Sequence, residues 1–173
     1  MQSERRFRFI DYLYSLDPVE DRDIFAAFRR GLGKPPGDVY EMYRYIYVPK
    51  VSPWIEKVCF MVASLFSLHP APGGNESLGV VMARLAQKVN GIVQYNPKDR
   101  NIGSIERRFL KLLSCHPDDL FEQLAHIVTL IKANNIPIDW NDLYWSLCRW
   151  NKEETRNENK KRWTRDFYRE LQK

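Results

Sequence analysis

The stretch that decides the fold is the most apolar part of the chain, and it reads PWIEKVCFMVASLFSL at residues 53–68. Its apolar residues recur at the three- and four-residue spacing of a helix. The positions that share one side of this helix are Ile55, Val58, Cys59, Val62 and Phe66. Pro53 suits the first turn, where a helix leaves its N–H groups unbonded, and the HPAPGG run at residues 69–74 ends the pattern. We predict a buried helix that is too short to cross a membrane.

Helical spacing continues on both sides of this stretch. The residues at helical spacing in the other helices are Phe7, Ile10, Leu13, Tyr14, Ile24, Phe25, Phe28, Tyr40, Tyr43, Ile46, Val81, Leu85, Val89, Ile105, Phe109, Leu112, Leu113, Leu120, Leu124, Ile127, Val128, Ile131, Tyr144, Leu147, Cys148, Trp163, Phe167 and Leu171. Asp38, Ser77 and Asp139 have side chains that can cap helix starts, and residues 117–119 (PDD) can open a further helix. No segment shows the two-residue alternation of a strand.

Residues 91–103 lack helical spacing and contain Asn, Pro and Gly, so we place a domain boundary within them. The predicted units are an N-terminal helical bundle at residues 1–92 and a C-terminal helical bundle at residues 93–173. The predicted fold class is therefore all-α, with two small helical bundles packed together.

The charge of the chain is moderately basic, with 27 Lys and Arg against 22 Asp and Glu. Residues 149–173 hold 9 of the basic and 5 of the acidic residues, so most of the excess lies in this stretch. Such a charge balance gives information about possible binding partners and not about the fold. The three cysteines are far apart and lie in apolar runs, which indicates thiols in a reducing cytoplasm rather than a disulfide framework. No signal peptide is visible at the N-terminus.

Motifs for catalysis and metal binding are weak. Residues 31–34 (GLGK) have one residue between the glycines and are followed by Pro35, whereas a phosphate-binding loop needs four residues there and Ser or Thr after the lysine. The histidines and cysteines show no CxxC or HxxxH spacing. Four acids fall at helix starts, where capping accounts for them: Asp118, Asp119, Asp139 and Asp142. We expect no active site, metal or cofactor, with a nuclease that uses these acids kept as an alternative.

Arginines recur on the polar faces of three predicted helices. Arg29 and Arg30 follow the apolar stripe of one helix, and Arg107 and Lys111 lie four residues apart on another, with Arg108 beside its core. Arg162, Arg165 and Arg169 share one side of the last helix, opposite its apolar residues. Arginine suits phosphate because its planar fork can donate two parallel hydrogen bonds. A solvated basic face is the alternative. The five tryptophans could stack on bases, but their positions favour core packing.

Several segments, taken in order, resemble the CasB family, the small subunit of type I-E CRISPR surveillance complexes (Cascade). The segments that carry the resemblance are FRRG at 28–31, YRYIYVP at 43–49, ASLF at 63–66, SIERRF at 104–109, VTLIK at 128–132, IPIDW at 136–140 and LCRW at 147–150. Their shared order, from about residue 21 to residue 167, is more specific than any single segment.

The resemblance implies a helical protein without enzymatic activity, present as two copies arranged head-to-tail in the complex. It implies contacts with the backbone and large subunits, and a basic surface that steadies the target and displaced strands of the R-loop formed between guide RNA and target DNA. By position, the resemblance assigns nucleic-acid binding to Arg29, Arg30, Arg44, Arg107 and Arg108. Helix geometry adds Lys111, Arg162 and Arg165. A scaffold whose basic faces meet acidic protein surfaces is the alternative from another class.

Overall fold

The computed structural model describes residues 2–46, 50–71, 73–100 and 103–173, with side chains from residue 9 onward. Its helices are α1 (Gln2–Ser15), α2 (Arg22–Arg30), η1 (Tyr40–Arg44), α3 (Pro53–Leu68), α4 (Leu78–Asn90), α5 (Ser104–Ser114), η2 (Pro117–Asp119), α6 (Leu120–Ala133), α7 (Trp140–Cys148) and α8 (Glu153–Leu171). The two η elements are short 3-10 helices. The described residues contain no strand, and the predicted all-α class is confirmed.

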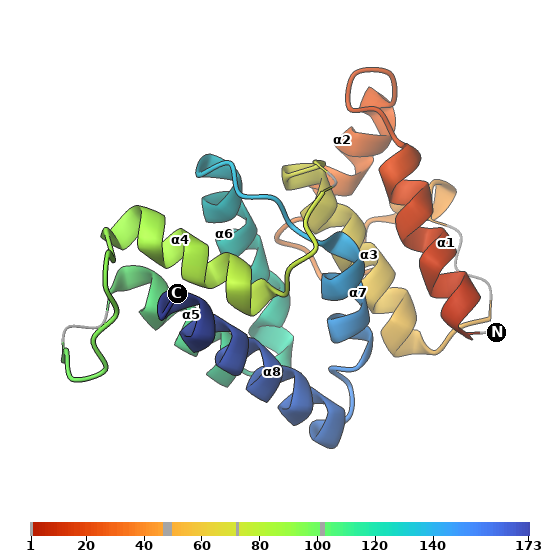
Figure 1. Cartoon of the computed structure of the whole chain (residues 1–173). Coiled ribbons are helices and arrows are strands. Elements are labelled where there is room, and N and C mark those ends of the chain that lie inside the picture. Colours follow the sequence, from red (N-terminus) through yellow and green to blue (C-terminus); the bar gives the residue numbers. More distant parts are fainter. Residues whose placement is uncertain (1, 47–49, 72, 101–102) are drawn as a thin grey trace.

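The helices form two groups that each combine early and late parts of the sequence (Figure 1). In one group, α3 packs against α1, α2 and α7. In the other, α4 packs most extensively against α8 and also contacts α5 and α6. Contacts between α3 and α6 join the groups. The predicted boundary between residues 92 and 93 stays a prediction, since α4 and α7 each pack against helices from the other side of it.

The apolar run of α3 is surrounded on all sides, as its composition indicates. Every residue from Val58 to Ser67 is buried. The Phe66 ring stacks on Phe25 of α2 at a centroid distance of 6.1 Å and meets Trp140 of α7 edge-on at 5.5 Å. Because aromatic side chains bury large areas, these contacts make α3 the central element of its group.

Most helix ends follow the predicted capping residues. Ser77 and Asp139 accept hydrogen bonds from the backbone N–H groups of Val80 and Asp142 at 3.5 and 3.0 Å. Asn90 ends α4, because the next residue, Gly91, takes a left-handed conformation with φ of 61°. That conformation strains residues with a Cβ atom.

Other details of the structure differ from the predicted ones or add to them. Val39 rather than Asp38 precedes η1, and no side chain caps this helix. Ile46 lies beyond η1, although it is buried. Residues 117–119 form the 3-10 turn η2, which leads directly into α6 as expected, and Val89 in the last turn of α4 is 44% exposed. Phe7 lies outside the described side chains.

A close approach between α4 and α8 depends on Gly79. A Cβ atom at this position would lie 2.0 Å from the carbonyl oxygen of Trp163, which is part of the backbone of α8. A distance under 3.0 Å is a clash, and a backbone atom gives way less readily than a flexible side chain. The absence of a side chain therefore sets how closely these two helices pack.

Candidate nucleic-acid interface

Arg29, Arg30 and Arg44 lie together on what we call the α2–η1 surface, which also includes Tyr40 and Tyr43. Arg29 and Arg30 occupy the exposed last turn of α2, and Arg44 is exposed at the end of η1. The guanidinium of Arg30 forms an ion pair with Glu41 of η1, which joins the two elements. The Arg29 side chain has no hydrogen bond or ion pair with any residue that the structure describes.

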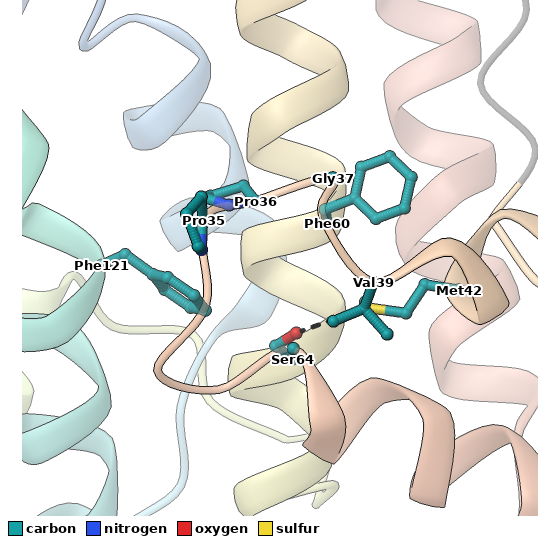
Figure 2. Close-up of a pocket in the computed structure, with 9 residues that line it drawn as sticks. Pro35, Pro36, Gly37, Val39, Met42, Phe60, Ser64 and Phe121 are labelled. Carbon is teal, nitrogen blue, oxygen red and sulfur yellow. Dashed lines mark hydrogen bonds between the residues drawn. The ribbon is translucent and has the colours of Figure 1, made fainter.

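The residues behind this surface hold η1 in place. Met42 is 1% exposed, and its sulfur receives a weak hydrogen bond from Ser64 of α3 at 3.9 Å. Figure 2 shows this contact and the narrow space beside it, which is also lined by Pro35, Pro36 and Phe121. The lining side chains fill this space, which cannot hold a water molecule. It is a packing contact and not a ligand pocket.

The α5 face, which we define as Arg107, Arg108, Leu110 and Lys111, points outward. All four residues are exposed, and the side chains of the three cations have no hydrogen bond or ion pair within the described chain. The opposite side of α5 is buried through Phe109, whose ring stacks on Phe167 of α8 at 4.6 Å. The apolar stripe of α5 therefore fixes the direction in which its cations point.

On α8, the structure separates two arginines that the sequence predicts to act alike. Arg162 donates hydrogen bonds to both carboxylate oxygens of Asp142 on α7, at 3.0 and 3.2 Å, and to the Ser146 hydroxyl at 2.7 Å. Burial raises the pKa of Asp142, and the neighbouring Arg162 opposes this effect. Arg165 is exposed and has no partner in the described residues. Arg162 therefore links helix α8 to helix α7.

The predicted site residues form two separate groups rather than one continuous patch. Figure 1 shows α2 at the upper right, whereas α5 and α8 lie side by side at the lower left. The Tyr168 hydroxyl of α8 donates a hydrogen bond to Glu106 of α5 at 2.7 Å, which confirms that these helices adjoin. Which of these residues contact nucleic acid stays a prediction.

Sequence reasoning missed the aromatic side chains of the α2–η1 surface. It placed Tyr40 and Tyr43 with Ile46 at the helical spacing of a short helix, and they are 82% and 48% exposed. The tryptophans, in contrast, are buried or partly buried, as predicted. No signal in the sequence could have distinguished the tyrosines, because their spacing relative to Ile46 fits an apolar stripe.

Three of the four helix-start acids have side chains engaged in local contacts. Asp139 caps α7, Asp142 binds Arg162, and Asp118 lies 3.3 Å from His116. The described residues contain no group of three or more His, Cys, Asp or Glu side chains that could hold a metal ion. Within the same residues, no helix is both long and apolar enough to span a bilayer. The three cysteines form no disulfide.

Comparison with known proteins finds the same family in sequence and in structure. The family model described as CRISPR-associated protein Cse2 matches residues 25–168. A curated CRISPR-associated protein Cse2 from Thermus thermophilus is 30% identical over 172 residues, which cover 93% of this chain and 88% of that protein.

Solved structures agree with this match. A Cse2-family protein from Thermus thermophilus is 25% identical, with a TM-score of 0.74 and coverage of 94% of this chain and 97% of that one. A chain of a CRISPR RNA-guided surveillance complex shares the fold at 24% identity, with a TM-score of 0.75 and coverage of 97% and 94%. CasB from M. ruber, also 24% identical, covers 96% of this chain and 94% of its own length with a TM-score of 0.71. The resemblance to CasB is confirmed, and this chain belongs to the Cse2 family of CRISPR-associated proteins.

Proposed function

We propose that this protein is a non-catalytic small subunit of a type I-E CRISPR RNA-guided surveillance complex, and that it binds nucleic-acid backbones without reading their sequence. In this role it contacts the backbone and large subunits, is present as a head-to-tail pair, and stabilises the target and displaced strands of the R-loop in the cytoplasm. The family membership and the fold shared with a chain of such a complex support the assembly part of the proposal.

The observation that carries the nucleic-acid part is the set of outward arginines without acidic partners. Arg29, Arg107 and Arg108 are exposed and make no ion pair within the described chain. Contacts of arginine with phosphate fix position and carry no sequence information. In an R-loop, a duplex is exchanged for another of similar stability, so a few backbone contacts are enough to shift the equilibrium.

The test removes the two arginine pairs together, as Arg29→Ala, Arg30→Ala, Arg107→Ala and Arg108→Ala. We expect the assembled complex to bind target DNA more weakly, by the same factor for different guide sequences. The dependence of log affinity on log salt should flatten by about 0.7 for each lost contact with a single strand. A melting curve and recovery of the intact complex show that folding and assembly survive.

Separate pairs sharpen the experiment. Arg29→Ala with Arg30→Ala and Arg107→Ala with Arg108→Ala are compared with Lys132→Ala and Arg149→Ala, which remove two exposed cations outside the predicted set. Unchanged affinity and salt slope in the quadruple variant would contradict nucleic-acid binding by these arginines. Failure of that variant to assemble would favour the scaffold function instead.

A further inference from the structure

The α2–η1 surface contains an exposed aromatic ring that the packing of the chain does not use. Tyr40 is 82% exposed, and its side chain has no hydrogen bond or ring contact with any described residue. Single exposed apolar residues are common on proteins. Tyr40 differs in its surroundings, because two exposed arginines without acidic partners, Arg29 and Arg44, belong to the same surface.

The local geometry places the ring and these cations together. Tyr40 is the first residue of η1 and Arg44 the last, so less than two turns of 3-10 helix separate them. Arg30 of α2 forms its ion pair with Glu41, the neighbour of Tyr40, which brings the end of α2 next to η1. Arg29 precedes Arg30 and is itself exposed.

The support beneath the ring is rigid. A 3-10 helix has three residues per turn, so Tyr40 and Tyr43 leave η1 on the same side, while Met42 points into the core. The Tyr43 ring packs against the buried Phe60 ring at a centroid distance of 4.6 Å. Because Met42 and Tyr43 anchor η1 to the core, the backbone of Tyr40 is held in place before any ligand binds, which lowers the backbone entropy lost on binding.

The charge around the ring favours a phosphate chain over an acidic or apolar protein surface. Glu41 is already neutralised by Arg30, whereas Arg29 and Arg44 have no acidic partner in the part of the chain that the structure describes. Two acids oppose this positive charge: Asp38, which is exposed two residues before Tyr40, and Glu56, which like Asp38 adds to the effect of burial in raising the pKa of the Tyr43 hydroxyl. The Arg44 guanidinium lies over the Tyr45 ring, 5.6 Å from its centroid. Positive side chains that follow a backbone, together with an aromatic ring on which a base stacks, are the features of single-strand binding sites.

We propose that Tyr40 is a stacking platform for an unpaired base of a nucleic-acid strand, and that Arg29 and Arg44 bind the phosphates on either side of that base. The α2–η1 surface then selects single strands over duplexes, because the bases of a duplex are already stacked and paired. The inference rests on the proposed function and adds to it a substrate class and a residue outside the predicted arginine set.

The experiment measures binding of the full-length protein to a single-stranded oligonucleotide and to a duplex of the same sequence at low salt. Tyr40→Ala removes the ring without removing charge, so we expect single-strand affinity to fall about tenfold with an unchanged salt slope. Duplex affinity should stay the same. Tyr40→Phe keeps the ring and should bind like the unaltered protein. Val93→Ala, which shortens a fully exposed side chain in the loop after α4, is the matched control.

A strand of abasic sites separates stacking from every other effect of the substitution. It keeps the phosphates and lacks the bases, so the unaltered protein should bind it about tenfold more weakly than the normal strand. The Tyr40→Ala protein should bind both strands equally, because each change removes the same contact. DNA and RNA strands are compared in parallel to identify which of the two the ring prefers.

The outcomes distinguish this inference from the proposed function. Absence of binding to any nucleic acid by the unaltered protein would overturn both. Unchanged single-strand binding by Tyr40→Ala, or equal weakening with normal and abasic strands, would overturn the stacking platform and leave the proposed function standing. If Tyr40→Ala binds strands normally and fails to join the complex, the ring contacts a protein and the inference is wrong.

Discussion

Helices α5 and α8 lie side by side and both carry arginines, but the two sets of side chains have different environments. Arg107 and Arg108 of α5 point outward and have no partner within the described chain, whereas Arg162 of α8 is bound by Asp142 and Ser146 of α7. The difference arises because α8 packs beside other helices at both of its ends. An arginine is available to a ligand only where no carboxylate from another helix has bound it first.

The contacts of α8 extend along most of its length. Near its start, Asn159 is buried and donates a hydrogen bond to the Ser146 carbonyl at 2.9 Å. In its second half, Asp166 accepts a hydrogen bond from Ser77 at 2.7 Å, and Glu170 pairs with Arg84 of α4. The α8 helix therefore contributes to stability, while α5 and the α2–η1 surface keep their cations exposed. Three predictions test this division, in order of decreasing effect.

The largest effect is expected where α8 meets α4. Gly79→Ala places a methyl group 2.0 Å from the Trp163 carbonyl, so the helices must move apart. Overpacking of this kind costs about 1–3 kcal/mol and occasionally more, and we expect about 3 kcal/mol because a backbone atom is in the way. Chemical denaturation measures the loss in free energy of unfolding. Val89→Ala on the exposed side of the same helix is the control and should change that free energy by less than about 0.5 kcal/mol. Equal stability of the two variants would show that α4 and α8 adjust freely.

A smaller loss of stability is expected when the ion pair between α7 and α8 is removed. Arg162→Ala leaves the half-buried Asp142 carboxylate without its cation, and we expect a loss of about 1–2 kcal/mol, since the pair is partly exposed to solvent. Arg165→Ala removes an exposed arginine three residues along the same helix and should cost less than about 0.5 kcal/mol. Thermal and chemical denaturation compare the two. If Arg162→Ala kept full stability and lost nucleic-acid binding, Arg162 would be a ligand-binding residue, and the stabilising role given to α8 would be wrong.

The smallest expected effect is on how the stability of the protein changes as the pH falls. Lys173 and Arg84 bind Glu170 and hold the pKa of its carboxyl below the ordinary value of 4.5. A carboxyl whose pKa is lower in the folded protein stabilises the fold above its unfolded pKa, and this stabilisation is lost as the pH falls through the folded pKa. Glu170→Gln should therefore reduce stability at neutral pH, and its stability should fall less steeply below about pH 4.5. Glu154→Gln, an exposed acid at the start of α8, is the control. Parallel pH profiles for all three proteins would contradict the role given to Glu170.

Much of the fold is predictable because helical periodicity is a local property. Val58, Val62 and Phe66 are spaced for one face of a helix, and each is buried in α3. Ser77 and Asp139 cap their helices because a hydroxyl or carboxylate reaches an N–H group only three residues away. The same reasoning failed at Tyr40 and Tyr43, since η1 is too short for its spacing to define a buried face.

The candidate site was predictable only as a set of residue types. Local spacing indicates that Arg30 and Arg107 leave their helices on the polar side, and both are exposed. Spacing cannot reveal that Glu41 binds Arg30 from 11 residues away, or that Asp142 binds Arg162 from 20 residues away. Such partners come from other elements, so the sequence alone predicted equal availability for arginines that differ in the structure.

By itself, the sequence determined that the chain is helical, where most helices begin and end, and which family it belongs to, because these properties depend on neighbouring residues and ordered motifs. Only the tertiary structure decided that α4 packs with α8 and α7 with α1 and α3, which arginines are bound to acids, and that Tyr40 is exposed. The physical reason is that packing and ion pairing join residues far apart in the chain. The geometry of these contacts is defined only once the helices have packed against one another.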